Sequence, residues 1–155
     1  MDLIKILSVD QDYVFLGERK DLVSILQETK VFKFRLIDHT EIRFYPDISW
    51  GTMVGGLPGL EVEGINVRAK TSPLGTDRLK VNFRTRIRPE HYFMIGLFIF
   101  FFMGTAFSNK PEPWWTFLYL FGLWIICHSW FQFIYRAQEN YLIEKLVKEL
   151  RLVKM

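Results

Sequence analysis

Basic side chains recur at alternating positions between Ile65 and Pro89, where they could hold anions. Six of them form the predicted binding site: Arg68, Lys70, Lys80, Arg84, Arg86 and Arg88. Alternate residues of a strand point to one face, so this spacing predicts a cationic strand face opposite an apolar one. Guanidinium groups form forked hydrogen bonds with phosphate and carboxylate groups. We therefore predict binding of anionic lipid, an anionic ligand or an acidic partner. The alternative is a solvated strand face with ordinary membrane-flanking charge.

Charge is segregated along the sequence. Residues 65–88 contain seven Lys or Arg and one acidic residue, whereas residues 1–64 contain seven Lys or Arg and eleven Asp or Glu. The formal net charge of the whole chain is only +3. Domains that bind nucleic acid are usually strongly basic, so this balance argues against nucleic acid as a partner.

A second group of polar side chains interrupts an apolar segment near residue 130. His128 and Gln132 are four residues apart and share one face of a helix. Inside a membrane, they are expected to hydrogen-bond to another helix or to a second copy of the chain. A proton or ligand site at His128 is the alternative, because ionisable residues in membranes are often functional. The one cysteine, Cys127, has no partner for an intrachain disulfide.

Catalytic and metal-binding motifs are not found in the sequence. The three histidines, His39, His91 and His128, are far apart, and no Cys/His cluster has metal-ligand spacing. The glycine-rich segment 47–64 lacks the lysine and hydroxyl residues of a phosphate-binding loop. This favours a non-enzymatic protein without a metal or cofactor, and an enzyme that lacks these motifs is the alternative.

Two long apolar segments determine the location that we predict. Neither 92–108 nor 114–135 contains a charged residue, and each approaches or exceeds the roughly 20 residues that a membrane helix needs. We predict a two-helix transmembrane hairpin over 91–136. Arginines flank its outer ends, whereas the short connection has one Lys and one Glu, so both termini of this integral membrane protein should be cytoplasmic.

Residues 1–90 predict a small cytosolic α+β domain with an antiparallel sheet and one short helix. Helical spacing of apolar residues covers 18–29, whereas the apolar patterns predict strands at 3–9, 13–16, 31–38, 41–46, 65–70 and 79–88. Phe34, Leu36, Ile42 and Phe44 share one face only if a three- or five-residue turn connects their strands.

The second membrane helix is expected to continue into a cytosolic amphipathic helix over 137–155. Its apolar stripe consists of Ile143, Leu146, Val147, Leu150 and Val153. This stripe can pack on the N-terminal domain, on a second copy or protein partner, or on lipid.

Together these patterns predict a membrane-anchored cytosolic binding or scaffold module. The bilayer is its first expected partner. The alternative is a homo-oligomeric membrane pore, transport component or membrane-disrupting effector that the soluble domain regulates. Its helices would associate through small residues such as Gly96, Gly104 and Gly122.

Overall fold

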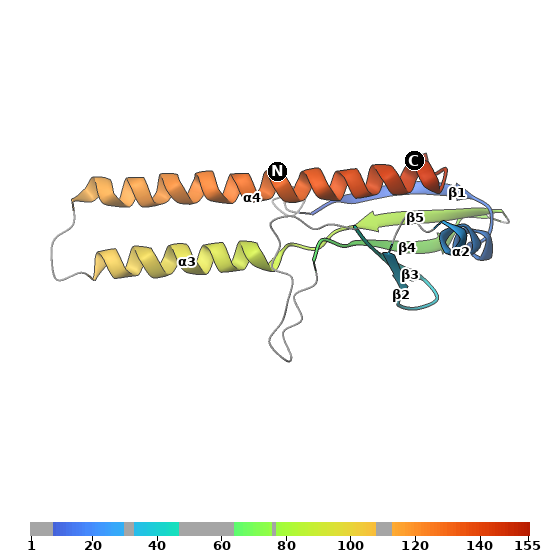
Figure 1. Cartoon of the computed structure of the whole chain (residues 1–155), viewed down its shortest axis with the longest axis horizontal. Coiled ribbons are helices and arrows are strands. Elements are labelled where there is room, and N and C mark those ends of the chain that lie inside the picture. The colour runs from blue at the N-terminus through green and yellow to red at the C-terminus, as the bar shows by residue number, and fades with distance from the viewer. Residues whose placement is uncertain (1–7, 30–32, 47–63, 76, 108–112) are drawn as a thin grey trace. The chain divides into compact units, whose positions relative to one another are not determined.

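The computed structural model describes residues 8–29, 33–46, 64–75, 77–107 and 113–155. In these residues the fold is α+β, with a six-stranded antiparallel sheet and three helices (Figure 1). The elements are β1 (Asp10–Leu16), α2 (Arg19–Glu28), β2 (Lys33–Leu36), β3 (Glu41–Tyr45), β4 (Val67–Pro73), β5 (Arg78–Arg84), α3 (Pro89–Ala106), α4 (Trp114–Glu149) and β6 (Val153–Lys154). The chain forms two compact units. One combines Met1–Ile87 with Tyr135–Met155, and the other is Arg88–Ile134.

The sheet has the strand order β2-β3-β4-β5-β1-β6, and every neighbouring pair is antiparallel. Side chains on its strands alternate between buried and more exposed, as the sequence pattern predicts. Phe83 lies near the middle of the apolar face, where it makes edge-on contacts with Tyr13 and Phe44 at ring-centroid distances of 5.5 and 6.4 Å.

Two helical segments contribute to the core with this apolar face. Leu22 and Leu26 come from α2, and Leu142, Leu146 and Leu150 come from the C-terminal part of α4 and its end. The predicted amphipathic stripe therefore packs within its own domain, which was one of the three expected surroundings. Glu18 caps α2 in a reciprocal capping box with Asp21.

The C-terminal helix is shorter than expected. It ends at Glu149, and Arg151 then adopts a left-handed conformation with φ 50°. The Leu152 N–H donates to the Val147 carbonyl, which is the backbone pattern of a helix C-cap. The turn buries Leu152 and allows Lys154 to pair with Tyr13, so Val153 leaves the predicted helical stripe and is exposed in β6.

The β2–β3 hairpin and the end of β5 can be compared with the predicted strands. Leu36 pairs with Ile42 across five intervening residues, which confirms the predicted register of this hairpin. β5 ends at Arg84, four residues earlier than predicted. Thr85 is opposite Val9 at the next position of the β1–β5 register, and there its side chain accepts the hydrogen bond that its carbonyl would accept in a continued ladder. The Thr85 N–H donates to the Val9 carbonyl, and its hydroxyl accepts a hydrogen bond from the Val9 N–H. The predicted strand at 3–9 lies largely outside the described residues.

The unit Arg88–Ile134 contains α3 and the apolar part of α4. Pro89 occupies the first turn of α3, where its missing N–H has no cost. Aromatic side chains connect the two helices, with Phe98 against Trp124 at 5.1 Å and Phe102 against Phe117 at 5.2 Å between ring centroids. Among the described helices, α4 is long and apolar enough to cross a membrane by length and composition.

Candidate anion-binding face

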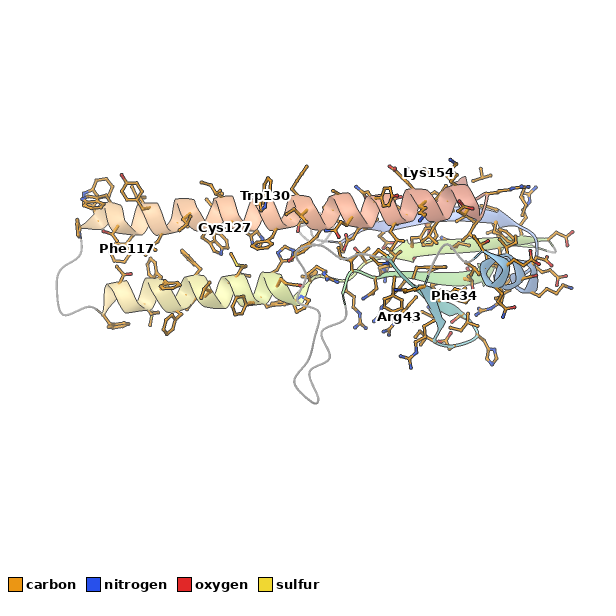
Figure 2. All side chains as sticks on the ribbon, viewed as in Figure 1. Phe34, Arg43, Phe117, Cys127, Trp130 and Lys154 are labelled. Atoms are coloured by element: carbon orange, nitrogen blue, oxygen red, sulfur yellow. The ribbon has the colours of Figure 1, made fainter. Side chains whose placement is uncertain are left out.

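Four arginines lie side by side on four adjacent strands of the sheet. The register pairs Arg35 with Arg43, Arg43 with Arg68, and Arg68 with Arg84. We call these four residues the arginine row. Their strand neighbours, such as Phe44 and Phe83, point into the core, so the row lies on the opposite face of the sheet. Figure 2 shows Arg43 extending from β3 on the side away from α4.

Two carboxylates from neighbouring strands contact the row. Asp10 is directly opposite Arg84, and their side chains form an ion pair of 2.7 Å. Glu41 lies 3.5 Å from both Arg43 and Arg68. Like charges that face each other across strands are unfavourable, so these acids lower the cost of placing the arginines together.

A second ion pair and an amide extend this network on β1 and β5. Lys80 pairs with Asp12 at 2.9 Å, and the Asn82 amide donates to Asp10 at 2.6 Å and to Asp12 at 2.9 Å. The hydrogen bonds from Asn82 hold the pKa of both aspartates below the usual range. Contact with Arg84 acts in the same direction on the pKa of Asp10, and contact with Lys80 does so for Asp12.

The side chains at the two ends of the arginine row are exposed to solvent, whereas those in its middle are largely covered. The Arg84 side chain is 65% exposed and Arg35 is also exposed. In contrast, the side chains of Arg43 and Arg68 are only 18% and 16% exposed. An incoming anion can therefore approach the row most easily at Arg35 or Arg84.

The structure brings together four of the six basic residues predicted as a site. Arg68, Lys70, Lys80 and Arg84 share the polar face of β4 and β5. Arg86 and Arg88 follow the end of β5, so they do not continue a strand ladder. Arg88 belongs to the unit Arg88–Ile134, where it forms an ion pair of 3.6 Å with Glu90 and is nearly buried.

Arg35 and Arg43 were missing from the predicted site. Both alternate with apolar residues, so the sequence places each on the polar face of its own strand. The sequence pattern does not predict that β3 pairs with β4. This pairing joins the two hairpins into one sheet. Without that pairing, Arg35 and Arg43 would lie on one hairpin, and Arg68 and Arg84 would lie on another.

Comparisons with known proteins identify no family. No protein-family model, no curated protein and no solved structure matches the chain. The chemistry of the arginine row is nevertheless specific, because planar guanidinium groups favour bidentate contacts with carboxylate and phosphate oxygens.

The predicted contact residues His128 and Gln132 lie near the first turn of α3. The rings of His128 and His91 are 4.7 Å apart between centroids, and His128 also stacks on Trp124 at 5.3 Å. Gln132 also interacts with the His91 side chain. Within the described residues, no group of three or more His, Cys, Asp or Glu side chains is arranged to hold a metal ion.

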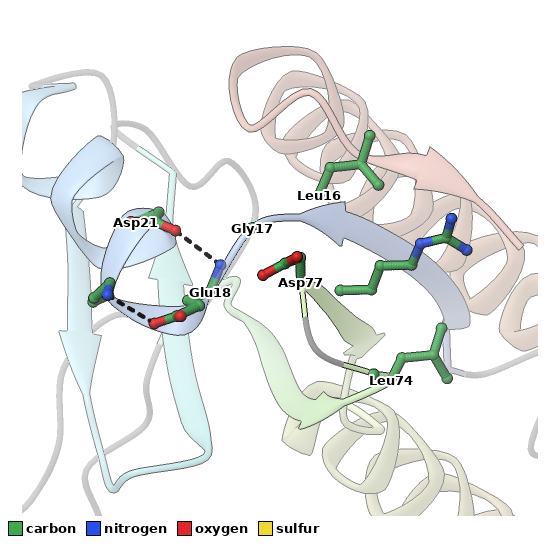
Figure 3. A pocket seen from close by; sticks show the side chains of 9 residues that line it. Leu16, Gly17, Glu18, Asp21, Leu74 and Asp77 are labelled. Carbon is green, nitrogen blue, oxygen red and sulfur yellow. Dashed lines mark hydrogen bonds and ion pairs between the residues drawn. The ribbon is translucent and has the colours of Figure 1, made fainter.

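A separate open hollow of about 860 Å³ lies beside the turn between β1 and α2 (Figure 3). It contains acidic residues that already have structural roles. The Asp21 carboxylate accepts a hydrogen bond from the Glu18 N–H at 2.8 Å, and Glu18 forms an ion pair with Lys20 at 2.9 Å. These contacts cap and flank α2, so the hollow has less to offer a ligand than the arginine row.

Proposed function

We propose that the protein is a membrane-anchored binding module whose α+β domain presents a basic sheet face to an anionic partner. The arginine row is the observation that carries this proposal. Four cations placed directly opposite one another destabilise a sheet, unless anions bridge them. The row already contains two such bridges, at Asp10 and Glu41. An anionic partner at the exposed Arg35 would add a third.

The exposed side chains of α3 and α4 support membrane anchoring. Phe100 is 71% exposed and Ile126 is 68% exposed, together with many other large apolar residues of these helices. Soluble monomers rarely leave so large an apolar surface in water, because its burial is strongly favourable. Lipid chains are the covering that the length and composition of α4 favour.

The core combines residues from before Arg88 and after Ile134, and this supports two membrane crossings. Met1–Ile87 and Tyr135–Met155 build one compact unit, and in this proposal the two segments therefore lie on the same side of the membrane. A chain that leaves one side and returns to it crosses an even number of times. If α4 crossed alone, Leu146 would be on the opposite side from Phe83, although both belong to one core. We therefore propose α3 as the second span, with cytoplasmic termini in accord with the flanking arginines.

The binding proposal is tested with the full chain in neutral phosphatidylcholine nanodiscs. Two probes are offered separately: vesicles that contain phosphatidylserine, and soluble polyglutamate. We expect the chain to bind at least one probe, and added salt should weaken the binding because ions screen the exposed charges. The double variant Arg35→Gln, Arg84→Gln should lose most of this binding.

The matched control removes two positive charges elsewhere in the same domain. Lys20→Gln with Lys148→Gln changes exposed positions on α2 and α4 and leaves the arginine row intact. It should bind both probes like the unmodified chain. If the unmodified chain binds neither probe, or if the control loses as much binding as the arginine variant, the basic face is not the binding site.

A homo-oligomeric pore is the second candidate. A Cβ atom added to Gly96, Gly104 or Gly122 would meet no described atom within 4 Å, so these positions allow another helix to approach closely. We rank it second because α3 after Glu90 and α4 before Arg136 carry no charged residue, and Phe-rich walls resist wetting. A defined oligomer that conducts ions in liposomes would reverse this order.

A further inference from the structure

The arginine row ends differently at its two sides. At the β1 end, Asp10 faces Arg84 across the strands and closes the row with a 2.7 Å ion pair. At the other end, Arg35 lies on β2, which is the edge strand of the sheet and pairs only with β3 in the part of the chain that the structure describes. Arg35 is exposed there. Among the residues that the structure describes, the Arg84 end of the row therefore has an acidic neighbour on the adjacent strand, and the Arg35 end has none.

We propose that an acidic extended segment of a partner protein adds, as a further strand, to the edge of β2 that no described strand covers. This inference rests on the proposed function, because Arg35 belongs to the same basic face, and it names the class of partner. The outer N–H and C=O groups of an edge strand are a template for another strand. An Asp or Glu opposite Arg35 would close the row as Asp10 does at the other end.

The side chains of β2 indicate the pattern of the added segment. Lys33 and Arg35 point to the basic face, whereas Phe34 and Leu36 point to the opposite face. Leu36 is 45% exposed, so apolar surface is available beside the edge. The segment should alternate acidic and apolar residues, with acidic side chains beside Lys33 and Arg35 and apolar side chains beside Phe34 and Leu36.

A second copy of the chain is a poorer occupant of this edge. Pairing two β2 strands with their basic faces on the same side would set Lys33 and Arg35 against the same cations of the other copy, which is unfavourable. Positive charges on edge strands are a common protection against such self-pairing. A lipid surface can neutralise Arg35, but it does not pair with the strand backbone.

The test measures fluorescence anisotropy of a labelled peptide of alternating Glu and Val residues, added to the full chain in neutral nanodiscs. We expect saturable binding, and Lys33→Glu with Arg35→Glu should weaken it about tenfold or more, because two favourable cross-strand charge pairs become repulsive. The control, Lys20→Glu with Lys148→Glu, makes the same charge change on the helices and should bind like the unmodified chain.

Two further arms separate strand addition from general attraction of charge. A Glu-Val peptide with N-methyl groups at every backbone nitrogen keeps its charge but cannot donate a hydrogen bond to the strand ladder from either edge, so it should not bind. A Lys-Val peptide should bind the Lys33→Glu, Arg35→Glu variant. This gain also shows that the variant is folded.

The possible failures have different meanings. If the N-methylated peptide binds as well as the parent, or if only phosphatidylserine vesicles bind, strand addition is wrong while the basic binding face stands. If neither peptides nor polyglutamate nor anionic vesicles bind, the proposed function fails as well.

Discussion

Asp10 and Asp12 set the charge at the closed end of the basic face. Each accepts a hydrogen bond from Asn82 and contacts a cation of β5, so both carboxyl groups titrate below their usual range of pKa. Their ionised forms are the counter-charges of Arg84 and Lys80. Protonation of the two aspartates would leave these cations available to other anions.

Acid should therefore weaken the domain. Because the pKa of each aspartate is lower in the folded chain, the contribution to stability is complete above the unfolded pKa of about 3.9 and is lost as pH falls through the folded pKa. We expect the melting temperature in detergent to decrease below about pH 4. Asp10→Asn with Asp12→Asn should make this decrease shallower, whereas Asp77→Asn, at the exposed β4–β5 turn, should not. Equal slopes for all three proteins would contradict this account.

Among the elements, α4 has two different surroundings along one helix. Its first part exposes large apolar side chains, and its last part supplies Leu142 and Leu146 to the core. The C-terminal part of α4 is therefore a structural component of the domain.

Leu146→Ala should reduce the free energy of unfolding of the α+β domain by about 2–5 kcal/mol, because it leaves a cavity in a packed core. Leu146 is fully buried, whereas Leu74 is 44% exposed beside the β4–β5 turn, so Leu74→Ala is the matched control and should cost much less. Denaturant titration of the full chain in detergent, followed by circular dichroism, measures both. Similar losses for the two variants would mean that α4 does not complete this core.

Local patterns in the sequence predict most of these elements, but not their ends or their neighbours. Alternation identifies β3 and β4, and helical spacing identifies α2, because each pattern depends on residues close in sequence. The end of β5 depends on hydrogen bonds between Thr85 and Val9, which are far apart in the chain. The arginine row likewise depends on strand order. Alternation assigns Arg43 and Arg68 to faces of their own strands, but only the pairing of β3 with β4 makes them neighbours.

For the whole molecule, the proposed topology makes a prediction that labelling can test. In a Cys127→Ser background, Lys110→Cys should react with a membrane-impermeant maleimide only from the non-cytoplasmic side. Ser24→Cys, on the exposed surface of α2, should react only from the cytoplasmic side. Glu144→Cys should behave like Ser24→Cys, because both positions belong to one compact unit. Reaction of Lys110→Cys from the same side as Ser24→Cys would refute the two crossings.

The interrupted domain also has a consequence for the order of events during synthesis. The ribosome makes the sheet strands β1 to β5 first, then Arg88–Ile134, and only later the residues of α4 that fill the core. At about 5–20 residues per second, translation from Arg88 to Leu150 takes several seconds. During this interval the apolar side of the nascent sheet lacks the part of its cover that α4 supplies, although α2 has already been made. A polypeptide truncated before Leu142 cannot complete the core, so the domain is finished only after residues 88–134 have been made.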